Sequence, residues 1–264
     1  MFISILRRMK ILFLALVMFT VGCSKDLEGL SIEEQAIYQP DRYADDKGRD
    51  KSRKPLEVLK FSGVKPGDTV IDLLGGGGYY SELFNYIVGD EGEVYLQNNS
   101  LFLRFSTEEL EQRLAKGRLK NVVRLDSEFA DMQLPTNVDL IFIGLSYHDI
   151  YVPRKDPVIT AKRDEFFNQI WDALKPGGAL LIIDHAAEPG TGKETTAKLH
   201  RIDEEWAKQD IESAGFRFEK ELDVLRNSND NYQLDIWKKG IMRKTDRFIH
   251  LYRKPDLSQG VENG

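Results

Sequence analysis

The stretch Asp72-Leu73-Leu74-Gly75-Gly76-Gly77-Gly78-Tyr79-Tyr80 decides the fold of this chain. It completes a short apolar run, residues 69–74, which is typical of a strand buried in a parallel sheet. Glycines at the end of such a strand let the backbone turn sharply and approach a ligand closely, and the helix that begins after them offers free N–H groups. The stretch therefore predicts a strand, a ligand-binding turn and a helix that ends near residue 88.

The rest of the chain repeats this alternation of strand and helix. Further apolar runs predict strands at residues 93–97, 122–125, 138–145, 179–184, 216–225 and 246–252. Helical patterns predict helices at residues 106–116, 164–174 and 202–214. Such alternation favours a mostly parallel sheet with helices on both faces. We expect an α/β fold, a Rossmann-like doubly wound sheet of seven strands. Because a long polar segment separates the last two strands, we expect one strand near the C-terminus to be antiparallel.

The glycine run does not match the two other common nucleotide-binding loops. A dinucleotide fingerprint needs G-x-G-x-x-G and, about 20 residues further on, an acidic residue that holds the ribose. Four consecutive glycines do not give that spacing cleanly, and the second predicted strand is followed by Asn98 and Asn99. A Walker loop is excluded because no Gly-Lys-Ser or Gly-Lys-Thr follows.

Two motifs resemble those of the class I S-adenosylmethionine (SAM)-dependent methyltransferases. Asp72-x-x-x-Gly76-x-Gly78 is similar to the first motif of that family, and Lys175-Pro176-Gly177-Gly178 is similar to the turn before its fifth strand. The resemblance spans residues 54–254. More narrowly, the chain resembles a group of predicted, exported bacterial methyltransferases of unassigned substrate. The segments that carry this likeness are residues 53–55, 76–80, 146–149, 184–187, 199–203 and 244–248.

The resemblance implies that SAM binds beside the glycine run. The residues expected to bind it are Asp72, Gly75, Gly76, Gly77, Gly78, Tyr79, Asn98 and Asp131. Two positions depart from the family pattern. Leu74 stands where most members have the first glycine, and Asn98 stands where an acidic residue holds the ribose hydroxyls. An amide binds a hydroxyl more weakly than a carboxylate does.

Three of the four histidines follow predicted strands at the ligand-binding edge of the sheet. Methyl transfer is an in-line displacement, and a base often removes a proton from the acceptor. An imidazole titrates near neutral pH and suits that role, which we expect for His148, with Asp149 orienting it or binding the acceptor. A histidine at such a position is otherwise an ordinary structural side chain, as we expect for His250. The candidate catalytic residues are His148, Asp149, His185 and His200.

Acidic residues after the fourth and fifth predicted strands suggest an alternative. In the catechol-type methyltransferases, a divalent metal at this place holds the acceptor oxygens. Asp149, Asp184 and His185 could serve similarly with oxygen and imidazole ligands. The spacing of these residues is not diagnostic, so a divalent metal is an alternative that we do not expect.

The first residues predict export and a lipid anchor. Arg7 and Arg8 give the N-terminal region a positive charge, and residues 11–21 are apolar. The segment Thr20-Val21-Gly22-Cys23 resembles the bacterial lipobox. Cys23 is the only cysteine of the chain, and two or more acyl chains on it would anchor the protein firmly. A plain signal peptide or a single membrane anchor is the alternative. We expect a signal peptide at residues 1–22, a tether and N-terminal cap at 23–53, the methyltransferase domain at 54–254 and a disordered tail at 255–264.

Together these patterns predict a SAM-dependent methyltransferase on the bacterial cell envelope, lipid-anchored and facing the periplasm. Its acceptor would be a small or lipid-like molecule. The net charge of −6 gives no sign of a nucleic-acid partner. Because SAM is made in the cytoplasm, two alternatives stay open. One is a non-catalytic binding protein with a methyltransferase fold. The other is a cytoplasmic enzyme that starts at Met9 or is not exported. The sequence does not predict the oligomeric state.

Overall fold

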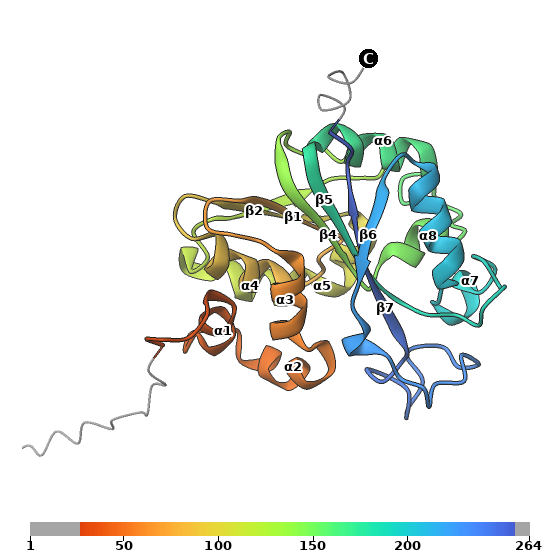
Figure 1. Cartoon of the computed structure of the whole chain (residues 1–264), viewed down its shortest axis with the longest axis horizontal. Coiled ribbons are helices and arrows are strands. Elements are labelled where there is room, and N and C mark those ends of the chain that lie inside the picture. The colour runs from red at the N-terminus through yellow and green to blue at the C-terminus, as the bar shows by residue number, and fades with distance from the viewer. Residues whose placement is uncertain (1–26, 257–264) are drawn as a thin grey trace, which may run out of the picture.

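A seven-stranded sheet forms the centre of the part of the chain that the computed structural model describes, residues 27–256 (Figure 1). The expected signal peptide, Cys23 and most of the expected tail lie outside the described residues. The strand order is β3-β2-β1-β4-β5-β7-β6. The strands are β1 (Thr69–Leu73), β2 (Glu93–Asn98), β3 (Val122–Asp126), β4 (Val138–Gly144), β5 (Leu174–His185), β6 (Arg217–Glu221) and β7 (Arg247–Arg253). Only β7 runs antiparallel to its neighbours, β5 and β6, in this sheet, which confirms the predicted architecture.

Helices cover both faces of the sheet (Figure 1). One face packs against α1 (Ile32–Tyr38), α3 (Pro55–Ser62) and α4 (Tyr79–Val88), and the other packs against α6 (Arg163–Ala173) and α8 (Glu204–Ser213). The remaining helical segments are η1 (Ala44–Asp46), α2 (Lys47–Arg53), α5 (Ser100–Leu114), η2 (Ala115–Gly117), η3 (Tyr147–Tyr151), α7 (Thr196–Leu199) and η4 (Asp223–Leu225). None of the helices within residues 27–256 is long and apolar enough to cross a membrane.

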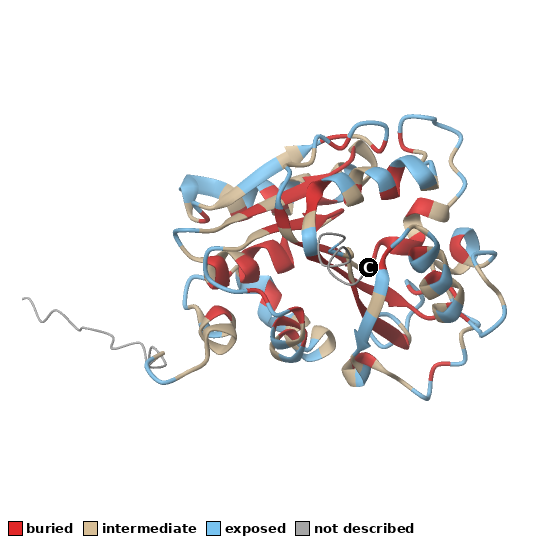
Figure 2. Cartoon of the chain, turned by 45° about the horizontal axis from the view of Figure 1, so that its top comes forward, coloured by how far each residue is buried: buried red, intermediate tan, exposed pale blue. Residues whose placement is uncertain are grey.

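Strand β1 shows why the central strands read as continuous apolar runs. Val70 lies in the apolar cluster beneath α4, whereas Ile71 and Leu73 lie in the cluster on the opposite face. Because helices cover both faces, both sets of side chains are buried. Figure 2 shows the buried residues along the central strands. The apolar run at residues 69–74 therefore reflects a strand that is covered from two sides.

The helix after β2 begins earlier than the sequence indicated. We expected it to start near residue 106, but α5 starts at Ser100. Its N-cap is Asn99, whose Oδ1 accepts a hydrogen bond from the N–H of Phe102 at 3.0 Å. Asparagine is a favoured N-cap because it satisfies one of the free N–H groups of the first turn. The expected start was wrong because Asn99 was taken as the end of the strand.

The segment Lys175-Pro176-Gly177-Gly178 falls inside β5, where it makes an irregularity in the pairing with β4. A Cβ atom at Gly178 would lie 3.0 Å from the carbonyl oxygen of Val138 and 2.9 Å from that of Lys175. Such a contact is too close for a side chain, so this position requires glycine. The segment expected to be a turn is thus a bulge within β5, where the pairing with β4 shifts its register.

The segment expected to be a tether and cap contains α1, η1 and α2, with a non-helical connection at residues 39–43. Ala36 of α1 is buried in the apolar cluster beneath α4. The expected domain boundary falls at Lys54, the single residue between α2 and α3, which adopts a left-handed conformation with φ 47°. Helix α1 therefore packs on the same core as the sheet.

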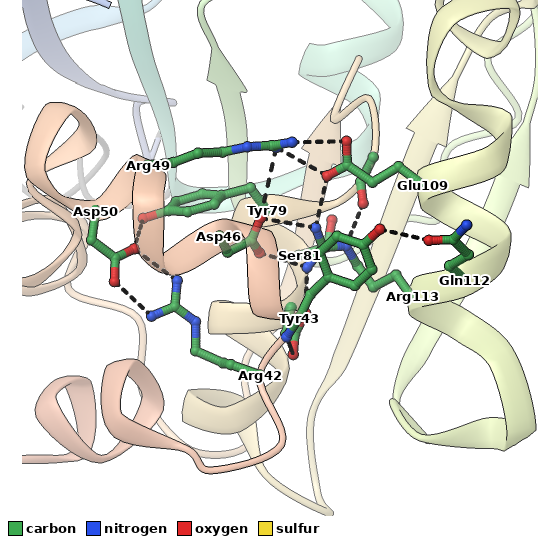
Figure 3. Close-up of polar contacts among 12 residues, drawn as sticks. Arg42, Tyr43, Asp46, Arg49, Asp50, Tyr79, Ser81, Glu109, Gln112 and Arg113 are labelled. Carbon is green, nitrogen blue, oxygen red and sulfur yellow. Dashed lines mark hydrogen bonds and ion pairs between the residues drawn. The ribbon is translucent and has the colours of Figure 1, made fainter.

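Arg113 of α5 ties the cap to the glycine run (Figure 3). Its guanidinium is fully buried, lies 2.7 Å from Asp46 of the cap and 2.9 Å from Glu109, and contacts Glu82 of α4. Its Nε also donates a hydrogen bond to the carbonyl oxygen of Gly77. A buried charge needs such partners because it has lost its hydration. The cap, α4, α5 and the glycine run are therefore held as one unit.

Replacing Arg113 by methionine tests this arrangement. We expect Arg113→Met to lower the free energy of unfolding by roughly 3–5 kcal/mol, because the buried carboxylates of Asp46 and Glu82 would lose their buried cation and keep only the partly exposed Arg49 and Arg118. Arg124→Met is the matched control, since Arg124 pairs with Asp126 at the surface, and should change the free energy by less than about 1 kcal/mol. Urea unfolding followed by circular dichroism measures both. Equal losses in the two variants would contradict the proposed tie.

Candidate active site

A cavity of about 360 Å³ lies at the carboxyl ends of β1, β4 and β5. Strands β1 and β4 are adjacent in the sheet. The chain continues from β1 to β2 in one direction across the sheet and from β4 to β5 in the other, and doubly wound sheets bind ligands where the direction changes in this way. Five of the residues predicted to bind the cofactor line this cavity: Asp72, Gly75, Gly76, Gly77 and Tyr79. The polar segment before β7 also contributes to the lining through Trp237 and Met242.

Asp72 fixes the conformation of the glycine run. Its buried carboxylate accepts hydrogen bonds from the N–H of Ser81 at 3.0 Å and from the Ser81 hydroxyl at 2.6 Å. Burial raises the pKa of Asp72 to about 6, against the opposing effect of these hydrogen bonds. A Cβ atom at Gly75 would lie 2.7 Å from Cγ of Asp72. The carboxylate that anchors α4 therefore requires a glycine at position 75.

Positions 77 and 78 require glycine because neighbouring side chains leave no room for a Cβ atom. A Cβ atom at Gly78, where φ is 84°, would lie 2.6 Å from Cδ1 of Leu96, and one at Gly77 would overlap Glu109. Gly78 is not among the lining residues of the cavity. Gly76 is different, because a Cβ atom there would have no neighbour within 4 Å. Of these glycines, Gly76 is thus the one whose missing side chain leaves open space.

Two leucines at the cavity adopt a left-handed backbone. Leu74 follows β1 with φ 56°, and Leu145 follows β4 with φ 66°. This conformation costs a residue with a Cβ atom about 1–2 kcal/mol, and strained residues cluster at ligand sites. At Leu74, where the sequence departs from the family pattern, the backbone thus adopts the geometry that glycine adopts most readily, although the side chain is leucine.

Asn98 and Asp131 do not line the cavity. The buried Asn98 side chain accepts a hydrogen bond from the N–H of Gly76 at 2.8 Å and donates one to the Gly76 carbonyl at 2.9 Å. Asp131 is exposed in the turn after β3, where its Oδ1 accepts from the N–H of Gln133. The Asn98 amide therefore holds the backbone of Gly76 in the glycine run, through one hydrogen bond at its oxygen and one at its nitrogen.

The tertiary structure brings the three candidate histidines together. The ring of His148 lies 6.1 Å from that of His185 and 5.5 Å from that of His200, centroid to centroid. Of the three, His185 lines the cavity. Asp149 lies beside this group, with one carboxylate oxygen 3.6 Å from Nε2 of His148.

Asp184, at the end of β5, organises this cluster. Its fully buried carboxylate accepts hydrogen bonds from the N–H of His185 at 2.7 Å and from the N–H of His148 at 2.6 Å, and lies 2.8 Å from the Nδ1 of His148. Burial lowers the pKa of His148, but the charges of Asp184 and Asp149 outweigh it and raise the pKa to about 9. This shift favours the protonated form of His148 at neutral pH, and an imidazolium has no free lone pair with which to take a proton from an acceptor.

The other two histidines are neutral at pH 7. Burial lowers the pKa of His185 well below its usual value, and the charges of His148 and Arg247 lower it further. Its Nδ1 lies 2.7 Å from the Thr245 hydroxyl. Burial and the charge of His148 also lower the pKa of His200. At the cavity wall, His185 is thus a neutral imidazole that can accept a proton.

His148, Asp149 and His200 are the residues here that could hold a metal ion. Their ligand atoms all lie within 4.8 Å of one another. This set differs from the one that the sequence suggested, because the carboxylate of Asp184 is occupied by hydrogen bonds. The Asp149 carboxylate also pairs with Arg154 at 2.9 Å.

His250 has the structural role that its sequence position indicated. It is buried in β7, with Nδ1 3.0 Å from the hydroxyl of Tyr252 and Nε2 2.8 Å from the carboxylate of Glu204. Both ring nitrogens therefore have partners within the fold.

Sequence reasoning missed the basic wall of the cavity. Arg53, at the end of α2, and Arg247, at the start of β7, both line it, together with Ser146. Both arginines lie in segments that carried the narrower family likeness, residues 53–55 and 244–248. That likeness was the only signal for them, because nothing local shows that the two side chains face one cavity.

Comparison with known sequences gives a partial match. No family model matches the chain. Over 129 residues, the chain is 34% identical to the ubiquinone/menaquinone biosynthesis C-methyltransferase of Teredinibacter turnerae, and the match covers 48% of this chain and 47% of that protein. The chain therefore spans about half the length of the curated relatives it matches.

Comparison with solved structures covers more of the chain. A SAM-dependent methyltransferase of Aquifex aeolicus superposes with a TM-score of 0.56 and 26% identity, covering 80% of this chain and 94% of that one. An N-methyltransferase of Haemonchus contortus, solved with phosphomonomethylethanolamine and S-adenosylhomocysteine, superposes with a TM-score of 0.53. That match covers 76% of this chain and 52% of the other at 19% identity, so it shows the fold alone.

The protonation of His148 gives a pH-dependent prediction. The pKa of His148 is about 9 in the folded protein and near 6.5 in the unfolded chain. The imidazolium therefore stabilises the fold fully below about pH 6.5, and this contribution, on the order of 3 kcal/mol, is lost as the pH rises through 9. In an NMR titration, we expect the His148 ring to change near pH 9 and the His185 ring to show no change above pH 6.5. A His148 midpoint at or below 6.5 would contradict this.

Proposed function

We propose that this chain, a distant relative of the class I SAM-dependent methyltransferases by its fold and its sequence, transfers the methyl group of SAM to a small or lipid-like acceptor. The observation that carries the proposal is the glycine run at the cavity, where Gly75 and Gly76 present bare backbone at the carboxyl end of β1. This arrangement fits a nucleoside-bearing cofactor, because backbone without side chains allows close approach.

SAM, when bound, supplies an electrophilic methyl group on a sulfonium. The chain has to orient the acceptor against it and keep the acceptor atom unprotonated. We assign the proton-accepting role to His185, which is neutral and lines the cavity. The Thr245 hydroxyl holds its Nδ1, so Nε2 remains to take the proton. Because the pKa of His185 is low, this base suits an acceptor whose own proton is acidic.

His148 and Asp184 then position the base. Asp184 accepts hydrogen bonds from the backbone N–H groups of both His148 and His185, which sets the two residues relative to each other. The charge of His148 also helps to keep His185 neutral. Loss of the Asp184 carboxylate would therefore affect turnover through His185 more than it affects SAM binding.

The cellular place that we propose is the bacterial envelope, with a lipid on Cys23 and the domain facing the periplasm. The support is the basic start and the Thr20-Val21-Gly22-Cys23 segment. The names of the curated relatives refer to ubiquinone and menaquinone, which are lipid-like molecules, and agree with an acceptor that reaches a membrane-anchored enzyme.

One observation favours a second candidate, a binding protein without turnover. The end of β2 offers Asn98, whose amide is committed to Gly76, where a carboxylate would hold the ribose of SAM. Measured SAM binding together with methyl transfer to any acceptor from a panel of acidic small molecules would exclude this candidate.

A substitution at Gly76 tests the cofactor site. Asparagine tolerates the left-handed conformation that Gly76 adopts at φ 59°, and its side chain would enter open space at the cavity. We expect Gly76→Asn to weaken SAM binding in calorimetry by at least about tenfold. Gly67→Asn is the matched control, because Gly67 has φ 86° and open space but lies outside the cavity lining. Equal SAM affinity in both variants would refute the placement.

A second experiment tests the lipid anchor. Cells that express the wild type or Cys23→Ser are grown with labelled palmitate and then fractionated. We expect label and membrane association in the wild type only, because the thioether and the amide of the acylated cysteine both need residue 23. Identical behaviour of the two proteins, with label in neither, would refute the anchor.

A further inference from the structure

We infer that Arg53 and Arg247 form an oxyanion-binding site in the cavity and that the methyl acceptor carries the acidic group, a carboxylate or a phosphate, that binds there. The inference builds on the proposed function and names the class of acceptor. Both arginines line the same cavity as the glycine run and His185. They come from opposite ends of the chain, Arg53 from α2 and Arg247 from β7.

Arg247 is a buried cation without a counterion. The residue is 6% exposed. Its Nε donates a hydrogen bond to the carbonyl oxygen of Thr245 at 3.3 Å, and this acceptor carries no charge. The other buried arginines of residues 27–256 each have a carboxylate within 2.8 Å: Arg42 with Asp50, Arg113 with Asp46, and Arg201 with Asp230. Arg247 has none within 4 Å among the described residues. An isolated buried charge is unfavourable, so a bound anion is the partner that this position lacks.

Arg53 adds a second, oriented guanidinium. Its charged carbon lies 4.6 Å from the centre of the Tyr79 ring and 5.5 Å from that of Tyr80. Stacking on an aromatic ring fixes the plane of a guanidinium and leaves its N–H edge free to bind an oxyanion in two places. Within the described residues, Arg53 forms no ion pair with a carboxylate. Both arginines line the one cavity, and the charge of Arg53 lowers the pKa of Arg247, after the larger effect of burial.

Ser146 supplies a third donor on the same wall. It follows β4, is 2% exposed, and its hydroxyl is buried without a hydrogen-bond partner among the described residues. Buried hydroxyls are normally paired, and an unpaired one in a binding cavity points to a ligand atom. Two guanidiniums and a hydroxyl together suit the oxygens of a carboxylate or a phosphate.

The charge balance assigns the anion to the acceptor. The one carboxylate among the lining residues is that of Asp72, which accepts hydrogen bonds from Ser81. The cofactor carries a sulfonium, an ammonium and a single carboxylate, so its net charge is positive and it cannot neutralise the wall. An acidic acceptor can. Arg247 also lies opposite His185 in the pairing of β5 with β7, which places the bound acid beside the proposed base.

Calorimetry separates the two sources of an anion. The protein is first saturated with S-adenosylhomocysteine, which occupies the cofactor site with its own carboxylate. We then expect benzoate or inorganic phosphate to bind, and the uncharged benzamide to bind at least about tenfold more weakly than benzoate. Arg53→Gln and Arg247→Gln should each weaken binding of the anion by at least about tenfold and change the affinity for S-adenosylhomocysteine by less than about twofold. Arg104→Gln, at an exposed position on α5, is the matched control and should change neither.

Two results would overturn the inference. One is that the arginine variants lose affinity for S-adenosylhomocysteine and not for the added anion, which would assign the site to the cofactor carboxylate. The other is that benzamide binds as well as benzoate. A wild type that binds the anion but not S-adenosylhomocysteine would support the anion site and contradict the proposed function, so the two failures are distinguishable.

Thermal unfolding provides a readout that a purely structural role would not give. Removing an uncompensated buried charge should leave the melting temperature of Arg247→Gln unchanged or higher. Arg201→Gln, which removes the partner of Asp230, should melt several degrees lower. Phosphate should raise the melting temperature of the wild type and not that of Arg247→Gln. The anion site would be contradicted if Arg247→Gln melts below the wild type and phosphate raises the melting temperature of neither protein.

Discussion

The buried guanidinium of Arg113 is the contact on which the shape of the cavity depends. Its partners lie on separate segments: Asp46 precedes α2, Glu82 lies on α4, and the carbonyl of Gly77 belongs to the glycine run. A charge that has left water needs all of these partners at once, so the segments can meet in few arrangements. Helix α2, which contributes Arg53 to the cavity, is thereby held near the glycine run.

A second buried charge, Asp184, performs the corresponding task at the end of β5. Asp184 accepts hydrogen bonds from the backbone of His148, in η3, and of His185, at the end of β5. It therefore connects the segment after β4 to the end of its own strand. The cavity therefore lies between two charged centres of opposite kind. One is the Arg113 cation, which binds carboxylates of the cap, α4 and α5, and the other is the Asp184 carboxylate, which raises the pKa of His148. The surface between them combines uncharged backbone at the glycine run with the unpaired cations Arg53 and Arg247.

The candidate site shows where reasoning from sequence succeeds and where it fails. Asp72, His185 and the first three glycines of the run were found because their positions at strand ends are visible in the order of the chain, and they line the cavity. The protonation state of His148 could not be derived from the sequence, because it depends on which carboxylate faces the ring. Asn98 was assigned to the ribose because the strand end suggested it, whereas its amide is used by Gly76.

The sequence by itself determined the alternation of strands and helices, the placement of one antiparallel strand near the C-terminus and the position of the ligand-binding turn. These follow from local properties, namely apolar runs, helix caps and the conformational freedom of glycine. Only the tertiary structure decided which side chains share the cavity and which charges they carry. Arg53 and Arg247 are distant in the chain and meet because β7 inserts beside β5. The pKa of His148 depends on burial and on the carboxylate of Asp184 on β5, and that of His185 depends on burial and on cations from other elements, so local sequence does not determine either.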